Sequence, residues 1–192
     1  MNIKNLWQKS IKLGSVGGLD VHAKPSAFLT FILLWILSSL LGVKLARWRT
    51  EKAVFIGFLA SVIHLLSETW HQIGHSRMAE QTGYPMEGIV FWGPLATSKY
   101  PANEGMLSAE MHIQRALGGP IFSILLALVA GTITLVLRPL GGPPLILVFF
   151  TFLDNLLVFT IGALSPLSFT DGGTLVRWWG QRQSGKRFLN LS

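Results

Sequence analysis

The stretch AVFIGFLASVIHLLSETWHQIGH, Ala53 to His75, is apolar for most of its length and becomes polar towards its end. It is close to the roughly 20 residues that a helix needs to cross about 30 Å of hydrocarbon. At about 100° per residue, the side chains of His64, Glu68, His71 and His75 fall on one stripe of such a helix. The stretch therefore predicts a membrane-spanning helix with one polar face.

The composition of the whole chain agrees with a membrane location. Of its 192 residues, 50% are hydrophobic and only 13% are charged, and the mean hydropathy is +0.48. Three further runs have a suitable length, namely Ala27–Val43, Ala116–Leu137 and Leu145–Leu164. We expect one α-helical integral membrane domain over residues 1–192, with about four transmembrane helices and both termini on one side. The first run should remain as an anchor, because no clear cleavage site follows it.

The net charge of +7 fits a lipid surface better than a nucleic acid. The basic residues lie at the ends of the apolar runs, where they meet anionic headgroups, and no basic patch interleaved with aromatic residues suggests nucleic-acid binding. Eleven of the sixteen Lys and Arg residues belong to the two termini and the loop 76–115. The excess of positive charge therefore places both termini in the cytoplasm.

Three segments outside the spans have their own signals. Residues 83–105 carry Gly, Pro and aromatic residues in short runs, which favours strands and turns against the membrane face, forming a small β segment. Residues 1–26 are expected to form an N-terminal strand or interfacial segment. In the C-terminal tail, 174–192, Trp178 and Trp179 stand among basic residues, as in an interfacial anchor.

The polar stripe indicates a site, because ionisable groups at membrane depth are costly and face a cavity, a partner or a metal. An interhelical hydrogen-bond network is the alternative, and it is the favoured interpretation for His64. His71 and His75 lie one helical turn apart, so that both imidazoles could bind one metal ion, although this spacing also arises by chance. A metal would need a further ligand, and the chain has no cysteine to supply it.

Of the nine carboxylates, Glu68, Asp154 and Asp171 lie in or beside apolar runs. Asp171 opens the segment DGGTL after the fourth run, where two glycines permit a return towards the bundle, and it is our candidate third ligand. Its alternative is an ordinary turn or helix cap. Asp154 lies within the fourth run and is the expected hydrogen-bond partner of His64.

Five motifs, in order along the chain, resemble the site-2 protease family of intramembrane zinc metalloproteases. They are GGLDVHAKPSAFL from residue 17, HQIGH from residue 71, GYPMEGIVFWGPLA from residue 83, ALGGPIFSILLAL from residue 116 and LSPLSFTDGGTL from residue 164. They are similar to the opening strand, the zinc motif, the membrane-associated strands, the Gly-Pro helix start and the Pro-rich turn of the family. Each is weak alone, but their common order makes the resemblance specific.

The resemblance implies a zinc ion held by His71, His75 and Asp171 below the cytoplasmic membrane surface. Members of the family cut transmembrane segments of other proteins. In such a site the metal activates a water molecule and a glutamate accepts its proton. The partners implied are therefore the bilayer and a transmembrane protein, either as substrate or as binding partner.

Two positions depart from the family pattern. The glutamate of HExxH is Gln72 here, and an amide cannot take up a proton at ordinary pH. Loss of the general base typically lowers the rate by about 10² to 10⁴. The family's asparagine, associated with substrate or oxyanion binding, falls on Ala163. Loss of such a hydrogen-bond donor removes about 3 kcal/mol of transition-state stabilisation. The resemblance thus favours a catalytically impaired homologue or pseudoprotease that keeps its metal ligands.

Two other functions remain open. Glu68 lies one turn before His71 and could substitute as the base of an active protease, or support a histidine ligand. Alternatively, the chain is a subunit of a larger membrane complex whose histidines bind a pigment, haem or another metal.

Overall fold

The computed structural model describes residues 9–189 and contains four helices long and apolar enough to cross a membrane among these residues. They are α2 (Pro25–Lys44), α3 (Thr50–Gln81), α4 (Ala109–Leu137) and a final segment formed by α5 (Gly142–Leu153) and η1 (Asp154–Gly162). Leucines such as Leu33, Leu128 and Leu135 are exposed on the outside of these helices, as lipid contact requires. The expected α-helical membrane fold with four spans is confirmed, and it is that of a multi-pass membrane protein.

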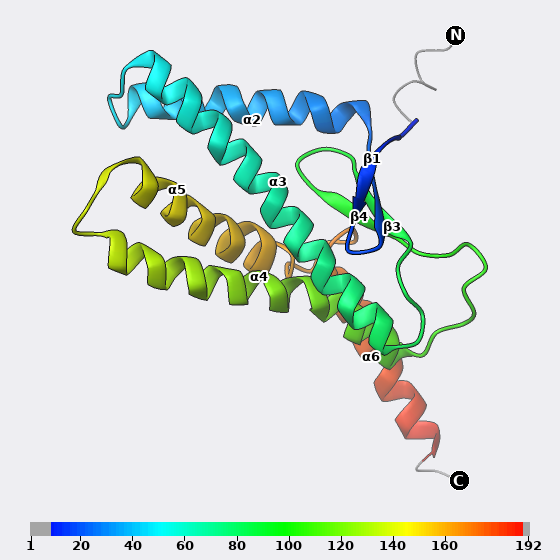
Figure 1. The fold of residues 1–192 in the computed structure, drawn as a ribbon. Coiled ribbons are helices and arrows are strands. Elements are labelled where there is room, and N and C mark those ends of the chain that lie inside the picture. The colour runs from blue at the N-terminus through cyan, green and yellow to red at the C-terminus, as the bar shows by residue number, and fades with distance from the viewer. Residues whose placement is uncertain (1–8, 190–192) are drawn as a thin grey trace.

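Helix α3 differs from the other spans and lies at the centre of the molecule (Figure 1). In its most apolar window 44% of the residues are buried inside the protein, against 17% to 22% for the other three spans. Its Gly74 faces Gly118 of α4 so closely that a Cβ on either residue would overlap the carbonyl of the other. Small residues at this crossing bring the two backbones together, and the polar stripe of α3 consequently faces the interior.

A four-stranded sheet lies beside the polar end of α3. Its order is β1 (Ile11–Val16), β2 (Leu19–Ala23), β3 (Gly88–Phe91) and β4 (Ala96–Lys99), with β2 and β3 parallel and the other two pairs antiparallel. Strands thus occur both in the N-terminal segment and in the segment 83–105, where the sequence predicts them. Because β4 is the last strand, one of its edges is not paired with another strand.

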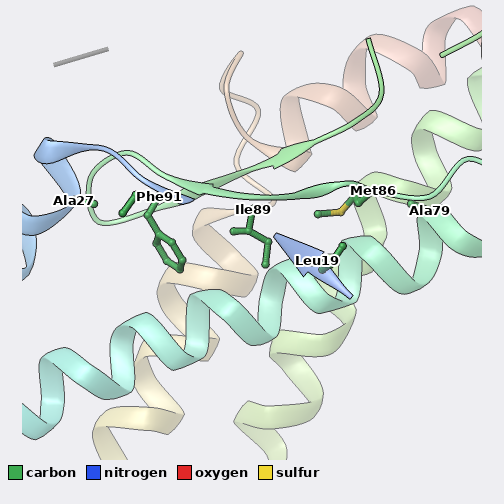
Figure 2. Close-up of a cluster of buried hydrophobic side chains, with 7 residues drawn as sticks. Leu19, Ala27, Ala79, Met86, Ile89 and Phe91 are labelled. Carbon is green, nitrogen blue, oxygen red and sulfur yellow. The ribbon is translucent and has the colours of Figure 1, made fainter. Parts of the chain in front are cut away.

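An apolar cluster attaches the sheet to the helices. Figure 2 shows Ile89 and Phe91 pointing from β3 towards α3, next to Leu19 of β2 and Met86. All four side chains are buried, and Ile89 is 0% exposed. This packing positions β4 alongside the polar residues of α3.

The chain returns to the bundle after the fourth span. Segment η1 is a π-helix, and one of its wide backbone bonds joins the amide of Ala163 to the carbonyl of Val158. A turn follows, and α6 (Asp171–Leu189) then packs against α4 (Figure 1). The segment 174–192, expected as an interfacial tail, is thus helical up to Leu189, and Asp171 is the first residue of that helix.

Candidate metal centre

A cavity of about 610 Å³ lies where the polar end of α3 meets β4, the start of α4 and the turn before α6. Three residues of the stripe, Glu68, His71 and His75, line it together with Gln72 and Asp171. The four residues of α3 are each at most 6% exposed. The cavity therefore collects the candidate residues of the sequence in one place.

Three side chains converge within this cavity. The Nε2 atoms of His71 and His75 are 3.1 Å apart. Asp171 Oδ2 lies 3.2 Å from Nε2 of His71, and Oδ1 lies 3.4 Å from Nε2 of His75. One ligand atom from each of these residues can be chosen so that all lie within 4.8 Å of one another. Two imidazoles from α3 and a carboxylate from α6 thus meet at one point.

The outer nitrogens of both imidazoles have partners. His75 Nδ1 donates to the carbonyl of Arg115 at 2.8 Å, and His71 Nδ1 lies 3.0 Å from the hydroxyl of Ser123. A neutral imidazole that donates from Nδ1 keeps its lone pair on Nε2 and can bind a metal there, whereas a protonated imidazole donates from Nε2 to Asp171 instead. The two partners therefore orient the rings with Nε2 towards the convergence point.

Asp171 is ionised at neutral pH. Burial alone would raise its pKa, but the charge of His75 and hydrogen bonds from both histidines hold the pKa of this carboxyl at about 2. Its position in the first turn of α6 also suits a negative charge, because backbone N–H groups point outward there. The donor set is two imidazole nitrogens and a carboxylate oxygen, which suits zinc.

Space for an ion at this point depends on Gly119 of α4. A Cβ on Gly119 would overlap Nε2 of both His71 and His75. A glycine thus leaves open the volume between the two nitrogens. The residues present therefore fit a metal ion both in chemistry and in space.

The side chains at the expected base position face β4. Gln72 Nε2 donates to Glu68 Oε1 at 2.9 Å, and Gln72 Oε1 accepts from the Ser98 hydroxyl at 2.8 Å. Glu68 Oε1 also accepts from the backbone N–H of Ala96 at 2.9 Å. Ala163, at the expected asparagine position, lines the cavity, and its carbonyl accepts from the amide of Gly172 at 2.9 Å.

His64 is paired with Asp154, which confirms the expected partnership. His64 Nδ1 lies 3.0 and 3.2 Å from the two carboxylate oxygens, and Nε2 lies 2.8 Å from the carbonyl of Pro94. Both residues are 6% exposed. His64 therefore ties α3 to η1 and to the turn between β3 and β4, away from the three converging side chains.

Sequence reasoning missed a buried arginine at the wall of the cavity. Arg115 is 5% exposed, and its guanidinium bonds both carboxylate oxygens of Glu104 and lies over the ring of Tyr100. Its place just before the apolar run at Ala116 predicts only a loop charge. Its place inside the first turns of a helix was the available signal, since an arginine next to an apolar face needs a partner.

No family model and no curated protein matches this chain in sequence. Among solved structures, the chain is similar to a site-2 protease from Methanocaldococcus jannaschii, with a TM-score of 0.59 and 19% sequence identity. The similarity covers 88% of this chain and 70% of the other. At this identity the comparison concerns the fold, and the chain has a site-2 protease-like fold.

Proposed function

We propose that this chain is a zinc-binding relative of the intramembrane proteases, with little or no peptide hydrolysis, that binds transmembrane segments of other proteins. The observation that carries the proposal is the convergence of His71, His75 and Asp171 in a cavity among the membrane helices. The site-2 protease-like fold supports it as well.

The three residues would hold the ion through Nε2 of each histidine and a carboxylate oxygen. A bound zinc would supply Lewis acidity, polarising a carbonyl group and lowering the pKa of water. Ser123 and the Arg115 carbonyl keep the imidazoles oriented. These contributions suffice for metal binding but do not include a proton acceptor.

Impaired hydrolysis follows from two side chains. Gln72 cannot accept a proton, and both ends of its amide are engaged with Glu68 and Ser98. Ala163 offers no side-chain donor to a developing oxyanion. Glu68 is the acid that could act instead, and it lines the cavity, but Oε1 already accepts from the amide of Ala96 and from Gln72.

The metal content of the purified protein tests the metal centre. We expect about one zinc per chain in the wild type and almost none in His71→Ala. His112→Ala is the matched control, because His112 also lines the cavity but stacks on Trp178 instead of joining the cluster. Stoichiometric zinc in His71→Ala, or a zinc-free wild type after reconstitution, would overturn the proposal.

Cleavage of transmembrane peptides in lipid vesicles tests the catalytic part. A panel of fluorogenic peptides should remain intact with the wild-type protein. Cleavage by the wild type would instead establish an active protease with an unusual base. An absorbance spectrum of the same preparation distinguishes a haem or pigment subunit from both.

A further inference from the structure

The unpaired edge of β4 faces the cavity and α3. In its antiparallel pairing with β3, Trp92 bonds the carbonyl of Leu95, and Phe91 stands opposite Ala96. Backbone groups alternate in direction along such a strand, so the N–H and C=O of Ala96 point away from β3. An edge of this kind normally needs covering.

Two side chains of α3 cover this edge. The N–H of Ala96 donates to Glu68 Oε1 at 2.9 Å, and its carbonyl lies 3.4 Å from Gln72 Nε2. The Ser98 hydroxyl donates to Gln72 Oε1 at 2.8 Å. Glu68 and Gln72 are joined to each other as well, at 2.9 Å. The strand is therefore held along one helical turn of α3 by side chains, where another strand would otherwise pair.

The clamp formed by Glu68 and Gln72 needs one acid and one amide. Glu68 Oε1 receives two N–H groups, one from Ala96 and one from Gln72, which a carboxylate does well. Gln72 donates through Nε2 and accepts through Oε1, and a carboxylate has no N–H to donate. A glutamate at position 72 would set a second carboxyl group against Glu68 Oε1 and the Ala96 carbonyl in place of the amide N–H groups that now bond them.

We propose that Glu68 and Gln72 act as one unit that closes the edge of β4 over the cavity. The amide at position 72 supplies the N–H groups that Glu68 Oε1 and the Ala96 carbonyl accept. Glu68 and Gln72 are thus positioning residues for the strand, and the loss of the general base is the consequence. The clamp stands without any metal, whereas its link to catalysis rests on the proposed function.

Hydrogen exchange of the segment 95–99, measured on metal-free protein in detergent, tests the clamp. Gln72→Glu should raise exchange in this segment about tenfold, as expected for a lost hydrogen-bond pair. The exchanged pair, Glu68→Gln with Gln72→Glu, keeps one acid and one amide, and it should return the rate to within about threefold of the wild type. Gln81→Glu is the matched control on the same helix, and it should leave the segment unchanged because Gln81 is exposed and bonds Gln114 of α4.

Ser98→Ala keeps the test decisive if Gln72→Glu does not fold. It removes one hydroxyl from a half-buried residue, and exchange of the same segment should rise by about threefold. Unchanged protection in Ser98→Ala and Gln72→Glu, or an exchanged pair as exposed as Gln72→Glu, would overturn the clamp.

Peptide cleavage gives an independent second measurement. With zinc bound, the exchanged pair should cut transmembrane peptides faster than either the wild type or Gln72→Glu, because its carboxylate stands at position 72 and β4 stays in place. Restored protection without restored cleavage would leave the clamp intact and contradict the catalytic part of the proposed function.

Discussion

Helix α3 contributes histidines to two clusters that each contain an aspartate. Both clusters pair buried imidazoles with a carboxylate, but we assign a structural role to one and a metal-binding role to the other. In one cluster His64 meets Asp154, and in the other His71 and His75 meet Asp171. All three histidines are at most 6% exposed. Burial and a carboxylate neighbour are therefore common to both clusters and do not by themselves distinguish a structural pair from a metal site.

The difference lies in where the ring nitrogens point. Both nitrogens of His64 face protein acceptors, namely the Asp154 carboxylate and the Pro94 carbonyl. In the second cluster each Nδ1 has a partner of its own, whereas the two Nε2 atoms face each other and share the single carboxylate of Asp171, at 3.2 and 3.4 Å. A cluster in which every ring nitrogen has a separate acceptor holds helices together, whereas one in which two ring nitrogens and a carboxylate converge can hold a cation.

The largest effect on zinc binding should appear when substitutions at the two aspartates, Asp171 and Asp154, are compared. Asp171→Ala removes a ligand, and we expect zinc content to fall to nearly zero while the helices stay folded. Asp154→Asn keeps the shape of the pair with His64 and should retain full zinc. Metal analysis of both purified variants checks this, and similar zinc contents in the two would erase the functional distinction between the clusters.

Filling the space between the Nε2 atoms should be nearly as severe. Gly119→Ala introduces a methyl group that overlaps both nitrogens, so we expect zinc binding to be lost although all three ligands remain. Gly131→Ala on the same helix is the control, since its Cβ would meet only the ring of Phe152, at 3.1 Å. Normal zinc content in Gly119→Ala would mean that the ion does not bind between the rings.

Sequence periodicity located the spans and the polar stripe because hydrocarbon thickness and the helical repeat leave few alternatives. The pairing of His64 with Asp154 could also be predicted, since a buried charge in an apolar span needs a partner. The convergence of His71 and His75 with Asp171 follows the resemblance in the motifs, because nothing local to DGGTL specifies where its carboxylate points.

Contacts that depend on packing were not predictable in the same way. Ser123 stands in an apolar run with no signal that its hydroxyl faces His71. The carbonyl that orients His75 belongs to the backbone of Arg115, and any residue could supply it. The clamp on β4 requires the register of the strand against α3, which depends on apolar packing between distant segments.

Breaking the pair of His64 and Asp154 should lower the stability of the protein more than it lowers metal binding. Asp154→Ala leaves a nitrogen of His64 in the interior without its hydrogen-bond partner, which typically costs about 1–3 kcal/mol of unfolding free energy. Denaturant unfolding in detergent micelles measures the change, with Asp154→Asn as the milder comparison because its side chain keeps an acceptor for the imidazole. A small loss in Asp154→Ala, with zinc gone, would reverse the roles that we assign to the two clusters.

The smallest effect should come from removing the hydroxyl that contacts His71 in the cluster of His71, His75 and Asp171. Ser123→Ala removes the hydroxyl 3.0 Å from Nδ1 of His71, and loss of such an outer partner typically weakens metal binding about 10- to 100-fold. Competition with a chromogenic chelator measures the affinity. Ser61→Ala is the control, because the Ser61 hydroxyl is also buried on α3 but bonds a carbonyl of its own helix, and its zinc affinity should not change. Equal zinc affinities in both variants would mean that the ring of His71 is oriented by packing against Phe159 and not by the Ser123 hydroxyl. His71 would then be held in place as an ordinary core histidine is.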